Sequence, residues 1–523
     1  MFPSQSFFAI FRSKTPAEKN CFEQAGLSRI KVQMKTIPGL RSGRLWTGAL
    51  LAFLFFGFST EAGAQFIFTN TAPKPLPRRT SVIVIVADGL GYGDLSCYGQ
   101  TKFQTPNLDR LAAEGMRFTG YYAGDAMSSP ARAALMLGRD SGHLKQRSDV
   151  EVPLAADDIS LAHMLKQAGY HTGLIGEWDL GGDGTGGAPW NKGFDEFAGF
   201  FDAGAAENYF ADQMWRYDAA VHINGSAAVY ANADGKKGQY LPDLFTTMAM
   251  NFMRNNQPDQ FNKHRPFFLL LNYTAVRANA AEMARTGNGM QVPTDAPFSE
   301  EPWPQPEKNQ AAMIARLDAN IGQLLDQLKK LGLDSNTVVF FTSDTGPHHD
   351  GGVDPNFFQS AGPFRGERGG LYEGGLHVPM IARWPGKIPA GLVSDLNWAA
   401  WDVLPTLADI ALTQSPTNVD GVSILPALAG KPLAQPREIF FRWELHGPEL
   451  AQAARLGDWK IVRSKSAEKW ELYNLKTDPG ETRNVADKYP KIIAAFEAGL
   501  KNFDNPKYPR PALPAPDSTD HNL

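Results

Sequence analysis

Cysteine is nearly absent from this chain of 523 residues, which contains only Cys21 and Cys97. Cys21 falls in an N-terminal segment that we expect to be removed, so the mature chain would hold no internal disulfide. An exported protein of this size does not require a disulfide, so the scarcity of cysteine is compatible with export. Neither cysteine follows the N-terminal apolar run at the place where a lipoprotein anchor would lie.

An excess of charge of one sign is also missing, because the formal net charge is only −4. That balance gives no reason to expect nucleic acid or an acidic membrane surface as a partner. Hydrophobic residues make up 43% of the chain and charged residues 20%, which is typical of a globular protein. The length favours more than one domain or subdomain around a large core.

The apolar run near the N-terminus, residues 45–58, is short for a membrane span. Two arginines precede it, and an Ala-x-Ala cleavage site ends at Ala64. We interpret residues 1–64 as a leader with a signal peptide, and a start at Met34 would give that peptide a normal length. A retained anchor is the alternative. The sequence thus predicts export to the periplasm or the cell exterior, with no stable membrane span once the leader is removed.

Buried strands and helices alternate after residue 78. Near-continuous apolar runs predict strands over 81–87, 171–176, 266–272 and 338–342. Apolar spacing predicts one helix over 106–115 and another that ends at Gly332. This alternation predicts an α/β fold, with a large, mostly parallel or mixed sheet flanked by helices.

Two aspartates stand where ligand groups gather in such sheets. Asp88 and Asp344 each follow a predicted strand directly, at its carboxyl end. The alternative interpretation is that they are ordinary turn or cap residues. Residues 275–309 have no clear period, and a stretch of that length is more often a functional loop than a linker.

The pattern changes towards the C-terminus. Short apolar runs over 439–443, 459–462 and 470–473 predict strands, and an amphipathic pattern over 491–503 predicts a helix. We expect a small antiparallel sheet with a closing helix. The domain prediction is a main domain over 78–425, a C-terminal subdomain over 435–505 and a loose tail over 506–523.

The stretch from Ser128 to Arg132, Ser-Ser-Pro-Ala-Arg, combines a hydroxyl, a helix start and an anion-binding side chain. Pro130 suits a first helical turn, Ser129 suits the N-cap, and Gly138 suits the helix end. A side chain at that start would face free N–H groups, and Arg132 would add a positive fork for an oxyanion. A capped surface helix with a solvated arginine is the alternative.

This stretch resembles the sulfatase family signature, which reads Cys or Ser, any residue, Pro, any residue, Arg. Further segments that resemble family motifs cover 87–94, 105–112, 343–348, 371–375, 457–460, 472–475 and 478–481. The resemblance implies the alkaline phosphatase superfamily fold and sulfate-ester chemistry on a sulfated carbohydrate or small ester. It also implies a calcium ion, and conversion of Ser128 to formylglycine, whose hydrate is the nucleophile.

Several site positions depart from the family pattern. The calcium ligands implied by the resemblance are two successive aspartates and a later Asp-Asn pair, and oxygen ligands suit that ion. Asp88 and Asp344 are retained, but Gly89 replaces the second aspartate and has no side-chain oxygen. Thr345 replaces the asparagine and offers only a neutral hydroxyl. Any calcium would therefore be weakly held.

The basic positions of the family have changed as well. Glu177 stands in place of the lysine that the family brings to the sulfate, and Asp179 in place of a nearby histidine or glycine. Arg277 replaces a histidine, and Arg368 replaces a second lysine. With Asp88, Asp344 and Arg132, these positions sum to a charge of −1 without metal, whereas a typical family site with calcium is positive. We assign structural roles to His348 and His349, next to Asp344.

Two hypotheses account for the substitutions. In the first, which we favour, Arg277 and Arg368 pair with the new carboxylates, and an ion-pair network replaces metal and substrate. In the second, Glu177 or Asp179 supplies the missing oxygen ligands, and a metal stays in a shifted position.

The functional prediction is an exported sulfatase-family protein with a degenerate active site, weak or absent hydrolysis, and a retained cleft for sulfated glycans or esters. One alternative is an active, divergent sulfuric-ester hydrolase that uses Ser128, with formylglycine and a divalent metal. A second is a phosphoesterase that uses unmodified Ser128, and a third is a structural partner subunit. The oligomeric state is not indicated.

Overall fold

The computed structural model of the protein describes residues 79–147, 152–433, 440–446 and 448–502. The predicted leader, its cleavage site and the predicted loose tail lie outside the described residues.

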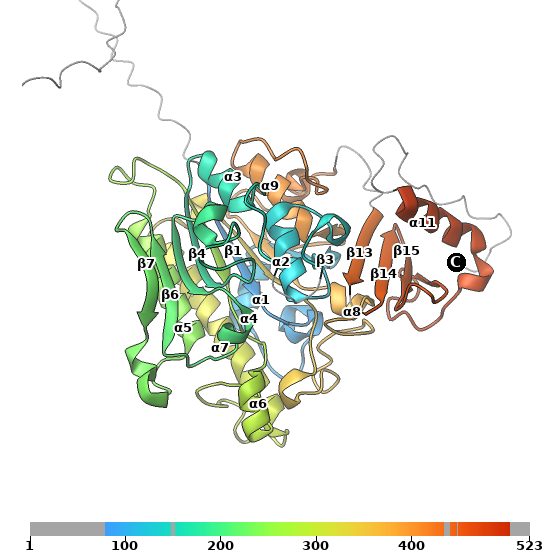
Figure 1. Ribbon diagram of the computed structural model, residues 1–523, viewed down its shortest axis with the longest axis horizontal. Helices are drawn as coiled ribbons and strands as arrows, with labels where there is room; N and C mark the ends of the chain where they lie inside the picture. Colours follow the sequence, from blue (N-terminus) through green and yellow to red (C-terminus); the bar gives the residue numbers. More distant parts are fainter. Residues whose placement is uncertain (1–78, 148–151, 434–439, 447, 503–523) are drawn as a thin grey trace, which may run out of the picture. The chain divides into compact units, whose positions relative to one another are not determined.

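A ten-stranded mixed sheet forms the framework of the main domain (Figure 1), with the strand order β11-β2-β10-β9-β1-β8-β4-β5-β6-β7. The central five strands run parallel: β9 (Thr337–Ser343), β1 (Ser81–Ala87), β8 (Phe267–Asn272), β4 (His171–Glu177) and β5 (Glu196–Phe200). The flanking strands are β10 (Met380–Arg383), β2 (Met116–Phe118), β11 (Leu392–Ser394), β6 (Gln213–Asp218) and β7 (Ile223–Ala228). The predicted fold class and the four predicted strands are therefore confirmed.

Helices pack on both faces of this sheet. The first face packs against α1 (Pro106–Ala113), α5 (Leu241–Asn255) and α7 (Gln305–Lys330). The second packs against α2 (Ser128–Leu137), α3 (Leu161–Gln167) and α9 (Val403–Ile410). Because side chains alternate along β1, Val82 and Val84 enter one core while Ile83 and Ile85 enter the other. Burial on both faces explains why this strand is an unbroken apolar run.

Several short strands and helices lie between these longer elements. They are β3 (Tyr121–Tyr122), β12 (Trp398–Ala399), α4 (Ala203–Ala206), α6 (Ala280–Thr286), α8 (Glu373–Leu376) and α10 (Leu425–Leu428). The helix α6 and the start of α7 lie within residues 275–309, so the expectation of a structureless loop there was wrong in part. Within the described residues, no helix combines the length and apolarity that crossing a bilayer requires.

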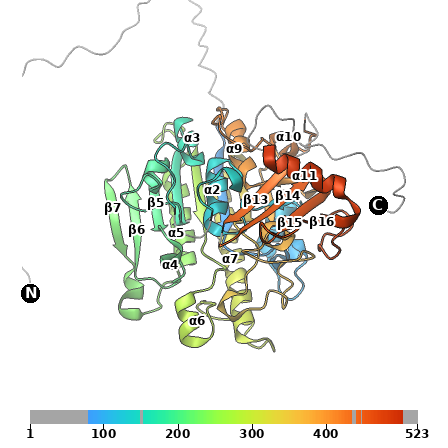
Figure 2. The same ribbon diagram turned by 45° about the vertical axis from the view of Figure 1, so that its right-hand side comes forward.

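The C-terminal part forms the predicted antiparallel sheet, which has four strands (Figure 2). These are β13 (Phe440–His446), β14 (Leu450–Leu456), β15 (Trp459–Arg463) and β16 (Glu471–Asn474), and the closing helix is α11 (Pro490–Asn502). Phe496 of α11 packs against Ile461 and Leu472 of the sheet. We did not predict β14, because its sequence contains three alanines, which have low strand propensity. Pairing with β13 on one side and β15 on the other holds it extended.

A buried lysine joins this small sheet to the main domain. Lys460 of β15 is fully buried, and its Nζ lies 2.9 Å from Glu373 Oε1 of α8 and 2.9 Å from Glu481 Oε1. A lysine is seldom buried without partners, and here both neighbours carry the opposite charge. The ion pairs therefore fix how the two sheets meet.

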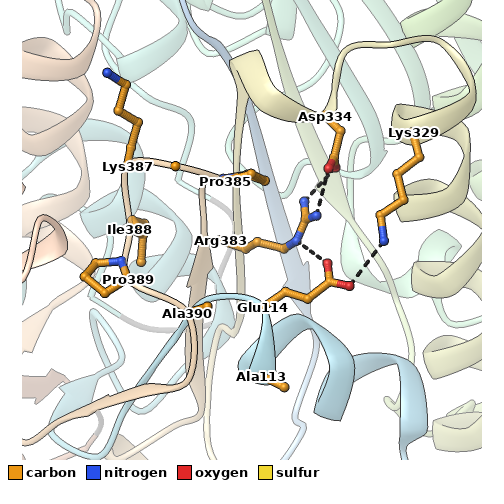
Figure 3. A pocket seen from close by; sticks show the side chains of 11 residues that line it. Ala113, Glu114, Lys329, Asp334, Arg383, Pro385, Lys387, Ile388, Pro389 and Ala390 are labelled. Carbon is orange, nitrogen blue, oxygen red and sulfur yellow. Dashed lines mark hydrogen bonds and ion pairs between the residues drawn. The ribbon is translucent and has the colours of Figure 1, made fainter.

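A hollow of about 740 Å³ lies near the amino end of β9 (Figure 3). Arg383 lies in it between Asp334, at 2.7 Å, and Glu114, at 2.8 Å. Glu114 also accepts a hydrogen bond from Lys329 at 3.2 Å. These four side chains come from or adjoin α1, α7, β9 and β10 and neutralise one another, so this network clamps the elements together.

Candidate active site

The topology brings the predicted site residues to one edge of the sheet. Ala87 of β1 pairs with Ser343 of β9, so the residues that follow them, Asp88 and Asp344, lie side by side. Glu177 is the last residue of β4, and Arg277 comes shortly after β8, the strand between β4 and β1. The carboxyl ends of parallel strands thus assemble the cluster, as expected for this class of sheet.

Arg132 of α2 is the centre of the cluster. Its Nη2 lies 2.8 Å from Asp88 Oδ2 and 3.1 Å from Asp344 Oδ2, and its Nη1 lies 2.5 Å from Glu177 Oε1. The side chain is 3% exposed, and all ten residues of α2 are buried. The alternative of a surface helix with a solvated arginine was therefore wrong.

Arg277 adds a second guanidinium to the same carboxylates. Its Nη1 lies 3.0 Å from Glu177 Oε1 and 3.3 Å from Asp88 Oδ2. Burial acts to lower the pKa of Arg132 and of Arg277, but the neighbouring carboxylates outweigh it and raise both pKa values. Both arginines are therefore charged. The arrangement is the one that the ion-pair hypothesis describes for Arg277.

The donor set differs at two positions from the calcium ligands that the family resemblance implies. Calcium takes six to eight oxygen ligands, and two of the family positions offer little here. Gly89 contributes only its N–H, which donates to Asp344 Oδ1 at 3.1 Å. The Thr345 hydroxyl is turned to the same oxygen, at 3.3 Å. Guanidinium groups already contact Asp88 and Asp344, so the positive charge that these carboxylates need comes from Arg132 and Arg277.

Ser128 is the first residue of α2 and is fully buried. Within the described residues, its hydroxyl has no hydrogen-bond partner. The helix is capped by Met127 without a side-chain bond, so the prediction that Ser129 is the N-cap was wrong. Because the helix begins at Ser128, Ser129 lies inside its first turn, and the Ser129 hydroxyl donates to the carbonyl of Asp179 at 3.1 Å. Gly138 ends the helix in the left-handed conformation, as predicted.

The two histidines after Asp344 have different surroundings. Burial lowers the pKa of His348, and its Nε2 donates to the carbonyl of Val276 at 3.1 Å. His349 is exposed and lies 2.8 Å from Glu367. Each contact ties together loop segments at the site edge. Our assignment of structural roles to both remains a prediction.

A cavity of about 530 Å³ opens beside the ion-pair network. Three predicted site positions line it, namely Asp179, Arg277 and Arg368. Sequence reasoning did not select the other two charged residues of its wall, Glu207 and Asp350. Two of these wall residues form an ion pair, in which Arg368 Nη1 lies 3.7 Å from Asp350 Oδ2.

Away from this edge, one group of described residues has metal-like spacing: Asp140, His143 and Asp420. The bond of His143 Nδ1 to Asp420, 2.8 Å long, raises the pKa of His143 to about 9. The imidazole is thus a cation at neutral pH. Arg442 also lies 3.2 Å from Asp140, so the group is an ion-pair cluster.

Comparison with known proteins agrees with this geometry. The family model described as Sulfatase matches residues 80–413, and that described as N-sulphoglucosamine sulphohydrolase, C-terminal, matches residues 367–505. The chain is 30% identical to arylsulfatase A of Homo sapiens over 492 residues, which cover 83% of this chain and 90% of that protein.

Two bacterial comparisons are similar in extent. The chain is 28% identical to N-acetylgalactosamine-6-O-sulfatase of Bacteroides thetaiotaomicron, with 81% of this chain and 93% of that protein covered. The solved structure of Ps i-CgsB in complex with k-i-k-neocarrahexaose aligns with a TM-score of 0.67 and 27% identity, covering 81% of this chain and 92% of that one. With the site motifs on one sheet edge and a family model matched over most of the described residues, the chain belongs to the sulfatase family.

Proposed function

We propose that this protein is an exported sulfatase-family member whose active site hydrolyses sulfate esters weakly or not at all. The observation that supports this most directly is the position of Arg132, which contacts three buried carboxylates. The positive charge of an arginine that faces three carboxylates is already offset, so Arg132 attracts an incoming anion less than an unpaired arginine would.

The charge of the cluster supports the same proposal. Asp88, Glu177 and Asp344 outnumber Arg132 and Arg277 by one, so the interior of the site is negative. Two charges about 4 Å apart interact by about 4 kcal/mol at an effective dielectric constant of about 20. A sulfate group brought to Ser128 would therefore be repelled by the excess carboxylate.

The proposed site works without calcium, because guanidinium groups supply the positive charge. An ion-pair network of this kind can hold a site together with little net stabilisation. The calcium that the family generally uses would then be dispensable for folding of this chain.

The Ser128 hydroxyl favours a second candidate, an active but divergent sulfuric-ester hydrolase. It lies at the N-terminus of α2, buried and without a partner in the described part of the chain. A buried, unsatisfied hydroxyl costs stability, and such groups often have a functional reason to persist. A phosphoesterase with unmodified Ser128 would use the same group.

One relative acts on a sulfated carbohydrate, as its name, N-acetylgalactosamine-6-O-sulfatase, indicates. We extend to this chain only the carbohydrate part of that recognition, in the cavity beside Arg277. Export is part of the proposal because of the predicted signal peptide. Sequencing the N-terminus of the secreted protein would test the cleavage after Ala64.

Three measurements test the catalytic part. Mass spectrometry of the Ser128 peptide from protein made in its native host should find unmodified serine; a loss of two hydrogens would contradict the proposal. Metal analysis of the purified protein should find no stoichiometric divalent ion. Aryl sulfate and aryl phosphate esters should be turned over no faster by the wild type than by Ser128→Ala. Ser226→Ala, which changes an exposed serine in β7, is the matched control.

A further inference from the structure

The cavity beside the ion-pair network has the size of a ligand site. Its volume of about 530 Å³ lies within the range of small-molecule sites. Its walls come from α4, from α6 and from the segments that contain Asp179, Asp350 and Arg368. These elements are far apart in the sequence, so the fold builds the cavity from several loops at the carboxyl edge of the sheet.

Carboxylates dominate the charge of this cavity. Asp179, Glu207 and Asp350 line it together with Arg277 and Arg368. Arg277 is also the arginine that contacts the buried carboxylates behind the wall. Counting wall and cluster together, the region has three more carboxylates than guanidiniums. Its potential is therefore negative, and a negative cleft with low-dielectric walls concentrates cations.

Glu207 is the acidic group best placed for a ligand. Its Oε2 accepts the N–H of Ala280 at 3.2 Å, and no described donor reaches its Oε1. The carboxylate is about half buried, and burial raises its pKa. A positively charged ligand would therefore relieve the electrostatic cost of the buried carboxylate as well as gain a hydrogen bond.

The rest of the wall is apolar. It consists of small residues and one flexible thioether: Ala203, Ala278, Ala280, Met283, Ala284 and Gly351. Such a surface suits the carbon skeleton of a ligand, and methionine adapts to irregular shapes. The cavity thus offers carboxylates for a charged group and an apolar face for the body that bears it.

We propose that this cavity binds an amine-bearing saccharide through its ammonium group, in preference to a sulfated one. The proposal rests on the proposed loss of sulfate-ester hydrolysis and names the ligand class of the same cleft. The ammonium group would lie against Glu207, with Asp179 and Asp350 adding longer-range attraction. A sulfate in the same place would meet an excess of negative charge.

The test is a titration with three tetrasaccharides that share one β-1,4-linked glucosamine backbone. The first has free amines, the second has N-acetyl groups, and the third has N-sulfate groups. Calorimetry is carried out at a pH where sugar amines are protonated and carboxylates ionised. We expect the amine form to bind about tenfold more tightly than the N-acetyl form, with the N-sulfate form weakest. Added salt should weaken binding of the amine form.

Variants assign the binding to this cavity. Glu207→Gln and Asp350→Asn should each weaken binding of the amine form by about three- to tenfold, as expected for loss of one partly exposed charge. Glu301→Gln removes an exposed carboxylate that does not line the cavity and should leave binding unchanged. The Asp350 side chain is 58% exposed, so we expect Asp350→Asn to fold normally. It therefore tests the cavity even if Glu207→Gln fails to fold.

Equal binding of the amine and N-acetyl forms, tighter binding of the N-sulfate form, or no binding of any form would each overturn this inference. Failure of the proposed function has a separate signature. If aryl sulfate is turned over while the amine form still binds at Glu207, the proposed function is wrong and the cation site stands. If there is no turnover and the amine form does not bind, only the cation site is wrong.

Discussion

Replacing Arg277 by alanine tests whether guanidinium groups have taken over the task of a metal ion. The variant removes the contacts of 3.0 Å to Glu177 and 3.3 Å to Asp88. Three buried carboxylates would then face Arg132 alone. The excess negative charge in the cluster would rise from one to two.

The expected cost can be estimated from these contacts. Two charges about 3 Å apart attract by about 5 kcal/mol at an effective dielectric constant of about 20, before desolvation is counted. Breaking a buried ion pair from one side costs about 3–5 kcal/mol in measured cases. For a chain of this size each kcal/mol lowers the melting temperature by about 1 °C, so Arg277→Ala should melt about 3–5 °C lower.

The assay is thermal unfolding followed by circular dichroism, with and without millimolar calcium. The wild type should show no shift with calcium or with a chelator. Arg277→Ala should regain part of its lost stability when calcium is added, because the freed carboxylates can then bind it. Arg285→Ala removes an exposed arginine that pairs with Glu282 on α6, and it should melt like the wild type.

Two outcomes would refute the reasoning. If Arg277→Ala melts at the wild-type temperature, the ion pairs do not hold the cluster together. If a chelator lowers the melting temperature of the wild type, a bound metal stabilises the native protein, and the hypothesis of a shifted metal site would replace the ion-pair hypothesis.

Three further predictions concern stability. The pKa of His143 is raised to about 9 in the folded state, so its bond to Asp420 should stabilise the protein fully below a pH of about 6.5. This stabilisation should be lost as the pH rises through about 9. Urea unfolding between these pH values should show that the free energy of unfolding of His143→Gln depends less on pH than that of the wild type. Lys460→Met leaves Glu373 buried without its cation and should cost about 3–5 kcal/mol by chemical denaturation. Gly138→Ala forces a side chain into a left-handed backbone conformation at the end of α2 and should cost about 1–2 kcal/mol in the same assay.

The framework of the fold was accessible from sequence because its signals are local. The apolar run over 81–87 predicted both ends of β1 correctly. A strand buried on both faces is apolar along its whole length, so its first and last residues are easy to recognise. Asp88 and Asp344 could be placed at one edge because parallel strands align their carboxyl ends. The motif resemblance then assigned these elements to one known fold.

The details that failed depend on contacts between distant segments. The Ser129 hydroxyl bonds the loop after β4 and not its own helix, and no local pattern encodes that choice. The strand β14 exists because two neighbours pair with it. Glu207 entered the cavity wall because α4 lies near α6, a proximity set by the tertiary fold. The pairing of Arg277 with Glu177 was predictable only because both occupied known family positions.

The backbone at Gly89 leaves no room for a metal-binding side chain at that position. Its φ is +68°, a conformation that residues with side chains rarely adopt, and a Cβ there would lie 2.8 Å from Cδ2 of His348. Restoring an aspartate would require the loop to change shape and the His348 ring to move, although that ring is held by a bond to the carbonyl of Val276. An engineer who wished to place a carboxylate at Gly89 would therefore have to rebuild this corner as a unit, because a side chain there would first collide with the His348 ring.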